Sequence, residues 1–178
     1  MKNKKNMQWE EKLSKAFGLN ESKWVNHANP WSVYTRFFIP VLLVLVIWSR
    51  VWLGIFCLIP IGVVIVWNFI NPLIFPHPKS TKNWASKCTF GERIWIKRKE
   101  YAIPKRHVKF PNWLMVFSAF SLPFLVHGLY HLDIWTTIAG LLIMAAGKAW
   151  FLDRMVWLYE DMKEGSEEFA KWEYPQQT

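Results

Sequence analysis

The chain has 178 residues, 52% of them hydrophobic, and a net charge of +9 at pH 7. This length suits one domain rather than two, and two cysteines are too few for the disulfide framework of a small secreted protein. The apolar residues are concentrated in four long segments, and the charges lie outside these segments or at their ends. The positive charge therefore indicates membrane topology and contact with anionic lipids, and we expect no nucleic-acid partner.

Residues 1–30 are expected to form a cytoplasmic segment before the first membrane helix. Within it, Trp9, Leu13 and Phe17 recur at four-residue spacing among Glu and Lys residues. This pattern is typical of a short amphipathic helix over residues 7–17, which either lies on the membrane surface or packs on the rest of the protein. The layout of a cleaved signal peptide is missing, so we expect the first membrane helix itself to be the targeting signal.

Four apolar segments predict four membrane-spanning helices. Their lengths fall in the window of about 17 to 25 residues that a helix needs to cross the hydrocarbon core. The alternative is a soluble all-α protein, but its core helices would show a polar face at a period of 3.6 residues, and these segments show almost none. The segments are also too long and too uniformly apolar for the strands of a barrel. They span residues 31–49, 51–70, 113–130 and 134–152.

The distribution of Lys and Arg predicts the orientation. Of the 22 such residues, only Arg50 falls on the side opposite to the rest. Loops rich in Lys and Arg stay in the cytoplasm. We therefore predict an all-α integral membrane four-helix bundle of two helical hairpins in the bacterial inner (plasma) membrane. Both termini and a basic loop over residues 71–112 would be cytoplasmic.

Asn, Asp and Pro residues mark the expected ends and bends of the helices. Asn29 supplies an N-cap that is followed by proline at the first helical position, and Asn112 and Asp133 are expected to cap the third and fourth helices. Three prolines are expected inside helices one, two and three, where each removes a hydrogen bond and bends the helix unless a neighbour bonds the freed carbonyl. Such bends either only curve the helices or open a cavity between them. The three are Pro40, Pro60 and Pro123.

The central loop and the fourth helix carry further expectations. A short helix is expected over residues 82–88, followed by an extended piece over residues 93–97. The fourth helix meets no helix breaker after the membrane, so it should continue to about Met162 and complete a domain over residues 31–162. Trp150 and Arg154 lie one turn apart on it, as a cation–π pair would. Residues 163–178 are expected to be an acidic cytoplasmic tail.

Polar and aromatic groups gather at the expected cytoplasmic ends of the helices. Such a convergence in an apolar surround is the usual mark of a binding site, although an aromatic belt that anchors the helices has the same pattern in sequence. Arg36 and Arg154 would pair with an anion. The amides of Asn29 and Asn71 would hydrogen-bond the same anion. Asp153 or Glu160 would orient an arginine or act as a base. The candidate ligand-binding residues are Asn29, Tyr34, Arg36, Asn71, Glu92, Arg93, Asp153, Arg154, Trp157 and Glu160.

His127 and His131 form a weaker candidate, for a metal or a haem. Their four-residue spacing could place two imidazoles on one metal. However, no second membrane helix offers a histidine across from them, and Asp133 is the only nearby carboxylate. Interfacial capping is the simpler interpretation, so we assign no metal and leave the cofactor unknown. A nucleotide-binding glycine loop and a nucleophile triad are both missing from the sequence.

Three segments carry a resemblance to a known family. They are NPWSVYTRF at residues 29–37, WASK and GER between residues 84 and 93, and GKAWFLDRMVWLYEDM at residues 147–162. They resemble a family of small uncharacterised bacterial integral membrane proteins. The resemblance covers residues 29–162 and leaves the tails at 1–28 and 163–178 outside. It implies a bacterial membrane protein and carries over no catalytic residue.

Two classes of function follow. The first is a membrane protein that binds an anionic lipid headgroup or an amphipathic small molecule at its cytoplasmic side, with catalysis left open. The second is a non-catalytic accessory subunit of a membrane complex, or a homo-oligomer, because Thr136, Gly140 and Gly147 form a stripe that suits helix–helix packing. A channel is disfavoured, since no polar stripe runs through a helix at mid-membrane.

Overall fold

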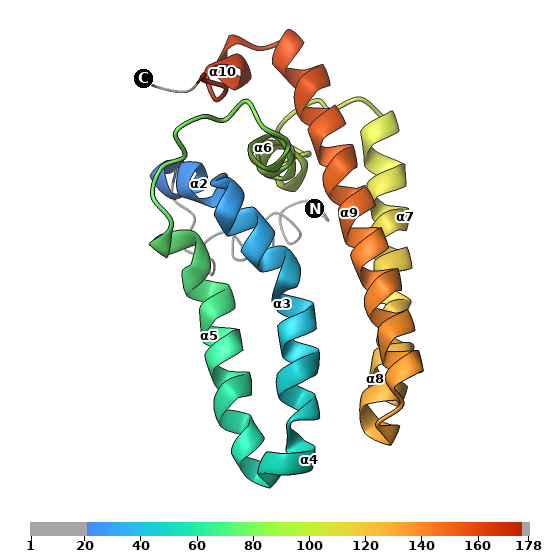
Figure 1. Ribbon diagram of the computed structural model, residues 1–178. Coiled ribbons are helices and arrows are strands. Elements are labelled where there is room, and N and C mark those ends of the chain that lie inside the picture. The colour runs from blue at the N-terminus through green and yellow to red at the C-terminus, as the bar shows by residue number, and fades with distance from the viewer. Residues whose placement is uncertain (1–20, 176–178) are drawn as a thin grey trace, which may run out of the picture. The chain divides into compact units, whose positions relative to one another are not determined.

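The computed structural model describes residues 21–175, and all regular structure among them is helical (Figure 1). The predicted all-α class is therefore confirmed, whereas the amphipathic helix predicted at residues 7–17 lies outside the described residues. The elements are α2 (Glu21–His27), α3 (Pro30–Trp48), α4 (Arg50–Leu53), the 3₁₀ helix η1 (Gly54–Cys57), α5 (Leu58–Ile74), α6 (Trp84–Ile96), α7 (Arg106–Ala119), α8 (Ser121–His131), α9 (Ile134–Glu164) and α10 (Glu167–Ala170).

Three stretches of the described chain are long and apolar enough to cross a membrane, which supports the expected membrane protein. They are Pro30–Ile74, Arg106–His131 and Ile134–Glu164. The first has 45 residues, because α3, α4, η1 and α5 follow one another almost without a break. The chain reverses within this stretch near Gly54, whose φ is +55°. Ser32 near the start of α3 hydrogen-bonds Asn71 near the end of α5, so the two helices run antiparallel (Figure 1).

The described chain divides into two compact units. The first unit comprises residues 21–33, 71–103 and 155–175, and the second comprises residues 34–70 and 104–154. Both cysteines are buried free thiols, with Cys88 in the first unit and Cys57 in the second.

Glycines bring α9 close to α7 and α8 inside the second unit. A Cβ atom at Gly140 would lie 2.9 Å from the side chain of Leu125, and one at Gly147 would lie 2.8 Å from Cβ of Ser118. These spacings are too short for any larger residue, so the backbones approach directly, as small residues allow in membrane helices. Two residues of the stripe that was expected to suit a partner helix are thus used within this chain.

Arg50 connects two turns of the second unit. Its guanidinium donates to the carbonyl oxygens of Leu129 and Tyr130, the latter at 2.9 Å. These carbonyls belong to the last turn of α8, where no intrahelical donor remains and the helix dipole favours a cation. The one arginine assigned to the outer side therefore ties the reversal after α3 to the end of α8.

The first unit contains a longer helix than the loop was expected to hold. The helix predicted near residues 82–88 is present but longer than expected, and the extended piece predicted at 93–97 is wrong, because one helix, α6, runs from Trp84 to Ile96. Asn83 caps it by accepting a hydrogen bond from the amide of Ser86 at 2.9 Å, and no proline follows before Pro104. Gly91 lies directly on α9, since a Cβ atom there would overlap the carbonyl oxygen of Met155.

The predicted helix ends are confirmed at two of three positions. The side chain of Asn29 accepts from the amide of Trp31 at 2.9 Å, and that of Asp133 accepts from the amide of Trp135 at 3.0 Å. Asn112 is not an N-cap: it lies inside α7, and its side chain donates to the carbonyl oxygen of Val108 at 2.9 Å. The predicted continuation of the fourth helix to about Met162 is confirmed, as α9 ends at Glu164.

The three prolines expected inside helices have different positions. Pro40 lies in the middle of α3. Pro60 and Pro123 are instead the third residues of α5 and α8. Amides of the first turn have no intrahelical acceptor, so proline removes nothing there. Only Pro40 among the three therefore interrupts a helix as expected.

Candidate functional site

A cavity of about 270 Å³ lies between helices of the second unit. Most of its lining is aliphatic, yet it also carries two cationic side chains and one amide. Ionisable groups within membrane helices are costly and are usually functional when they line a cavity. The lining residues are Arg36, Ile39, Pro40 and Leu43 of α3, Val64, Ile65 and Asn68 of α5, and Lys148 of α9.

Lys148 of α9 bonds a backbone carbonyl of α3 that Pro40 leaves without its helical donor. Pro40 has no amide hydrogen, so the carbonyl of Arg36, four residues earlier, loses its helical donor. The Nζ atom of Lys148 donates to this carbonyl oxygen at 3.3 Å. An ammonium group has three N–H donors, and this bond uses one of them. The neighbour that was expected to satisfy a freed carbonyl is thus a cation at the edge of the cavity.

A second cavity of about 210 Å³ lies next to the first and shares Pro40 and Lys148 with it. Its remaining lining is entirely apolar. The ammonium of Lys148 also lies 5.7 Å from the centre of the Phe37 ring, within the range of a cation–π contact. The lining residues are Phe37, Phe38, Pro40 and Val41 of α3, and Leu141, Met144, Ala145 and Lys148 of α9.

Arg36 and Lys148 lie at similar heights along their helices. Arg36 precedes the end of α3 at Trp48 by about 18 Å, and Lys148 follows the start of α9 at Ile134 by about 21 Å, at 1.5 Å per residue. A hydrocarbon core is about 30 Å thick. If the turns at Trp48 and Ile134 mark one face of the membrane, Arg36 lies about 12 Å and Lys148 about 9 Å from the other boundary, where phosphate headgroups begin.

The other predicted site residues of the second unit do not line either cavity. Tyr34 is exposed. Asp153 and Arg154 pair with each other at 3.3 Å, with side chains 43% and 32% exposed, so solvent screens the pair. Arg154 also lies 6.0 Å from the centre of the Phe110 ring, and that ring contacts Trp150 edge to face. Phe110 thus lies near both members of the cation–π pair expected between Trp150 and Arg154.

Asn29 and Asn71 hydrogen-bond to distant parts of the chain within the first unit. The amide of Asn29 donates to the carbonyl oxygen of Pro76 at 2.9 Å. The side-chain oxygen of Asn71 accepts from the hydroxyl of Ser32 at 2.8 Å, with both side chains buried. Both amides therefore stabilise the ends of α3 and α5, in addition to any contact with a ligand.

Arg93 lies in an aromatic environment of the first unit. Its side chain is buried at 7% exposure, and its guanidinium carbon is 4.2 Å from the Trp172 ring and 5.9 Å from the Trp24 ring. Stacking on aromatic rings is a typical use of a guanidinium. Its neighbour Glu92 is half-buried, whereas Trp157 is 56% exposed.

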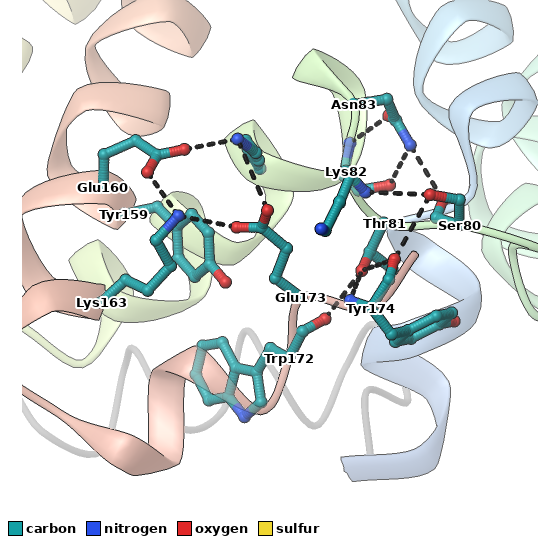
Figure 2. Close-up of polar contacts among 12 residues, drawn as sticks. Ser80, Thr81, Lys82, Asn83, Tyr159, Glu160, Lys163, Trp172, Glu173 and Tyr174 are labelled. Atoms are coloured by element: carbon teal, nitrogen blue, oxygen red, sulfur yellow. Dashed lines mark hydrogen bonds and ion pairs between the residues drawn. The ribbon is translucent and has the colours of Figure 1, made fainter. Parts of the chain in front are cut away.

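Glu160 belongs to an ion-pair network of the first unit (Figure 2). Its two carboxylate oxygens lie 2.6 Å from the ammonium groups of Lys87 and Lys163. Lys163 also bonds Glu173 at 2.8 Å. Glu160 is thus paired with two lysines rather than with the arginine that it was expected to orient.

The C-terminal segment, which was expected to be an acidic tail, contacts α6 and α9. The hydroxyl of Thr81, which is fully buried, donates to the carbonyl oxygen of Trp172 at 2.9 Å and accepts from the amide of Tyr174 at 2.8 Å (Figure 2). The hydroxyl of Tyr159 donates to the carbonyl oxygen of Phe169 at 3.1 Å. Backbone carbonyls of the segment are thus bonded by buried side chains.

His127 and His131 lie together, as their spacing predicts. Their ring centres are 4.5 Å apart, and both residues are exposed. Asp133 nearby is used as a helix cap, and the hydroxyl and amide of Thr136 that bond it hold the pKa of its carboxyl below the usual value. Within residues 21–175, no group of three or more His, Cys, Asp or Glu side chains could hold a metal ion.

Sequence reasoning selected Arg36 but missed Lys148 and Asn68 as cavity residues. Lys148 had a signal of its own, since it interrupts the apolar run of the fourth segment, and an ionisable residue at such a position is a candidate by default. The ion pair between Glu160 and Lys87 and the contacts of Glu173 had no comparable signal in the sequence, because these residues are distant along the chain.

Comparison with known proteins identifies a family. The model of a family described as "Family of unknown function (DUF6653)" matches residues 8–174. This range includes the three motif-bearing segments and also most of both tails, which the resemblance had left outside. No curated protein and no solved structure matches the chain.

Proposed function

This chain belongs to the DUF6653 family, and we propose that it is an integral membrane protein that binds an anionic amphiphile at the cytoplasmic boundary of the bacterial inner membrane. The binding site is the cavity lined by α3, α5 and Lys148. The headgroup lies against Arg36, Lys148 and Asn68, and hydrocarbon lies against the aliphatic lining.

The observation that carries this proposal is the lining of the cavity itself. Two cations and one amide open into a space otherwise formed by Ile, Leu, Val and Pro side chains. Ligand sites have this composition, with apolar walls and a few placed polar groups. Arg36 offers the fork geometry that suits phosphate and carboxylate groups. The eight lining residues include no carboxylate, imidazole, thiol or hydroxyl, so binding is favoured over catalysis.

The topology that we propose has four crossings, with both termini and residues 71–112 in the cytoplasm. A straight helix of 45 residues would extend about 68 Å, more than twice the hydrocarbon thickness. The reversal at Gly54 divides the stretch Pro30–Ile74 into two crossings of ordinary length. The excess of Lys and Arg in the central segment supports the cytoplasmic assignment.

Lipid analysis of the intact protein tests this proposal. The protein is extracted in a mild detergent from its membrane and examined by native mass spectrometry and lipid extraction. We expect retained anionic lipid on the wild type, and a loss of about tenfold or more in the variant that combines Arg36→Gln with Lys148→Gln, as each charge-assisted hydrogen bond contributes about 1.5–3 kcal/mol. Lys79→Gln, at an exposed lysine outside the cavity, is the matched control.

Two outcomes would contradict the proposal. Retention that is equal for the wild type and the double variant would show that the cavity does not select the anion. A stoichiometric partner protein without retained lipid would favour the accessory-subunit alternative instead. The stripe that suggested that alternative is at least partly occupied within the chain, since Gly140 contacts Leu125 and Gly147 contacts Ser118.

A further inference from the structure

We propose that the ligand of this site is a two-chain lipid with a phosphate headgroup, and that its two acyl chains occupy the two cavities beside Pro40. This inference rests on the proposed function, because it specifies what the same site holds. The phosphate lies at Lys148 and Arg36, and one chain extends into each cavity.

The two cavities meet at the residues that would hold the headgroup. Pro40 of α3 and Lys148 of α9 line both cavities. Each cavity otherwise has its own walls, formed by α3 with α5 in one case and by α3 with α9 in the other. A molecule anchored at Lys148 can therefore enter both, and a two-chain lipid branches close to its phosphate.

The chemistry of the second cavity indicates a hydrocarbon occupant. Its lining includes no polar side chain other than Lys148. A polar ligand group there would lose its hydrogen bonds to water without replacement, which costs several kcal/mol by transfer from water to hydrocarbon. An acyl chain has no such cost, and it gains contact with Phe37, Leu141 and Met144.

The first cavity accounts for the headgroup. Arg36 and Asn68 line it together with Lys148, so two positive charges and an amide border the same space. A phosphate has the charge and the acceptor oxygens to bond all three groups, and its tetrahedral oxygens accept from more directions than the two coplanar oxygens of a carboxylate. Free phosphate has the same headgroup chemistry but no chains, and it is therefore one arm of the experiment.

Binding of matched phosphate compounds to the full-length protein in detergent tests the inference. The probes are a diacyl phosphatidic acid, the one-chain phosphatidic acid with the same acyl group, and inorganic phosphate. We expect the two-chain lipid to bind about tenfold more tightly than the one-chain lipid, because burial of roughly two methylene groups already supplies a factor of ten. Inorganic phosphate should bind the weakest.

Filling the second cavity should remove the advantage of the second chain. In Ala145→Leu, the enlarged side chain enters that cavity, and the two-chain lipid should bind only as tightly as the one-chain lipid. Ala146→Leu, at the exposed neighbouring position on the same helix, is the control and should behave as the wild type. Val41→Phe fills the same cavity from α3 and replaces Ala145→Leu if that variant does not fold.

The failures of the two proposals are distinguishable. Equal affinities for the one-chain and two-chain lipids in the wild type, or an unchanged ratio in both cavity-filling variants, would overturn the two-chain inference alone. Binding of inorganic phosphate as tight as that of either lipid would also overturn it. Failure of all three probes to bind, or equal binding to the Arg36→Gln Lys148→Gln variant, would overturn the proposed function as well.

Discussion

Lys148 on α9 donates a hydrogen bond to the carbonyl oxygen of Arg36 on α3 at 3.3 Å. This carbonyl is the one that Pro40 deprives of its helical donor. One contact therefore satisfies a backbone group that a helix interrupted by proline would otherwise leave unpaired, and it brings a second cation to the cavity beside Arg36. Lys148 thus both pairs the free carbonyl of α3 and lines the proposed binding site.

The first prediction concerns the coupling of Lys148 to Pro40. Lys148→Met should lower the free energy of unfolding, because the carbonyl of Arg36 loses its donor. The loss should be smaller when Pro40→Ala is present, since alanine restores the amide of residue 40. We expect a coupling energy between about 0.6 kcal/mol, the average for hydrogen bonds between membrane helices, and about 1.7 kcal/mol, the largest value. Denaturant unfolding in mixed micelles measures all four proteins of the cycle.

The control for this cycle is Lys109→Met, at an exposed lysine of α7. It should show no coupling to Pro40→Ala. Strictly additive effects of Lys148→Met and Pro40→Ala would mean that the ammonium does not replace the missing amide.

The second prediction concerns Arg50. Arg50→Ala should destabilise the protein by about 1–3 kcal/mol, because two carbonyls at the end of α8 lose a charged donor. Arg50→Lys keeps the charge but not the planar fork, so it should recover only part of the loss. Unfolding by denaturant measures both variants. A wild-type stability for Arg50→Ala would show that the connection between the turns carries no free energy.

The third prediction concerns the attachment of the C-terminal segment. Glu173→Gln removes a partner of Lys163, and the effect should be about 0.2–1 kcal/mol, as for partly exposed ion pairs. High salt should reduce the difference from the wild type, because salt screens the pair. Limited proteolysis after residue 165 reports opening of the segment. Glu168→Gln, at an exposed glutamate of α10, should leave cleavage unchanged at every salt concentration.

The fourth prediction concerns pH. The pKa of Asp133 is lowered below its usual 3.8, chiefly by the hydrogen bond from the hydroxyl of Thr136. A lowered pKa in the folded state contributes stability that is present above pH 3.8 and is lost as the pH falls through the folded-state pKa. The stability difference between the wild type and Asp133→Ala should therefore persist down to about pH 5 and should shrink below about pH 4. A constant difference down to the lowest pH would argue against the charged cap.

The fifth prediction concerns topology. A membrane-impermeant maleimide should label Trp52→Cys on intact cells, since this residue is highly exposed at the turn after α3. Lys79→Cys, in the basic central segment, should react only after lysis. Both variants are made in a background with Cys57 and Cys88 replaced by alanine. The reverse pattern of labelling would place the central segment outside the cell.

Local sequence signals predicted the features that depend on neighbouring residues. The caps at Asn29 and Asp133 and the long helix α9 depend on hydrogen bonds within a few residues, so they were predictable. Asn112 was misread because the same side chain can cap a helix or bond back to a carbonyl within one. Residues 93–97 were misread because their contacts are long-range: Gly91 lets α6 approach Met155 of α9, and both Ile94 and Trp95 are buried.

The candidate site was predictable only in part. Arg36 was selected because a charge at the end of an apolar segment is visible in sequence. Lys148 is visible in the same way, but its partner is not, since the carbonyl of Arg36 lies 112 residues earlier. The apolar helices, with the charges collected at their ends, follow from the sequence, because hydropathy and local hydrogen bonding are properties of neighbouring residues. The position of Pro40 and Lys148 between two cavities follows from the fold, because packing alone brings distant helices into contact.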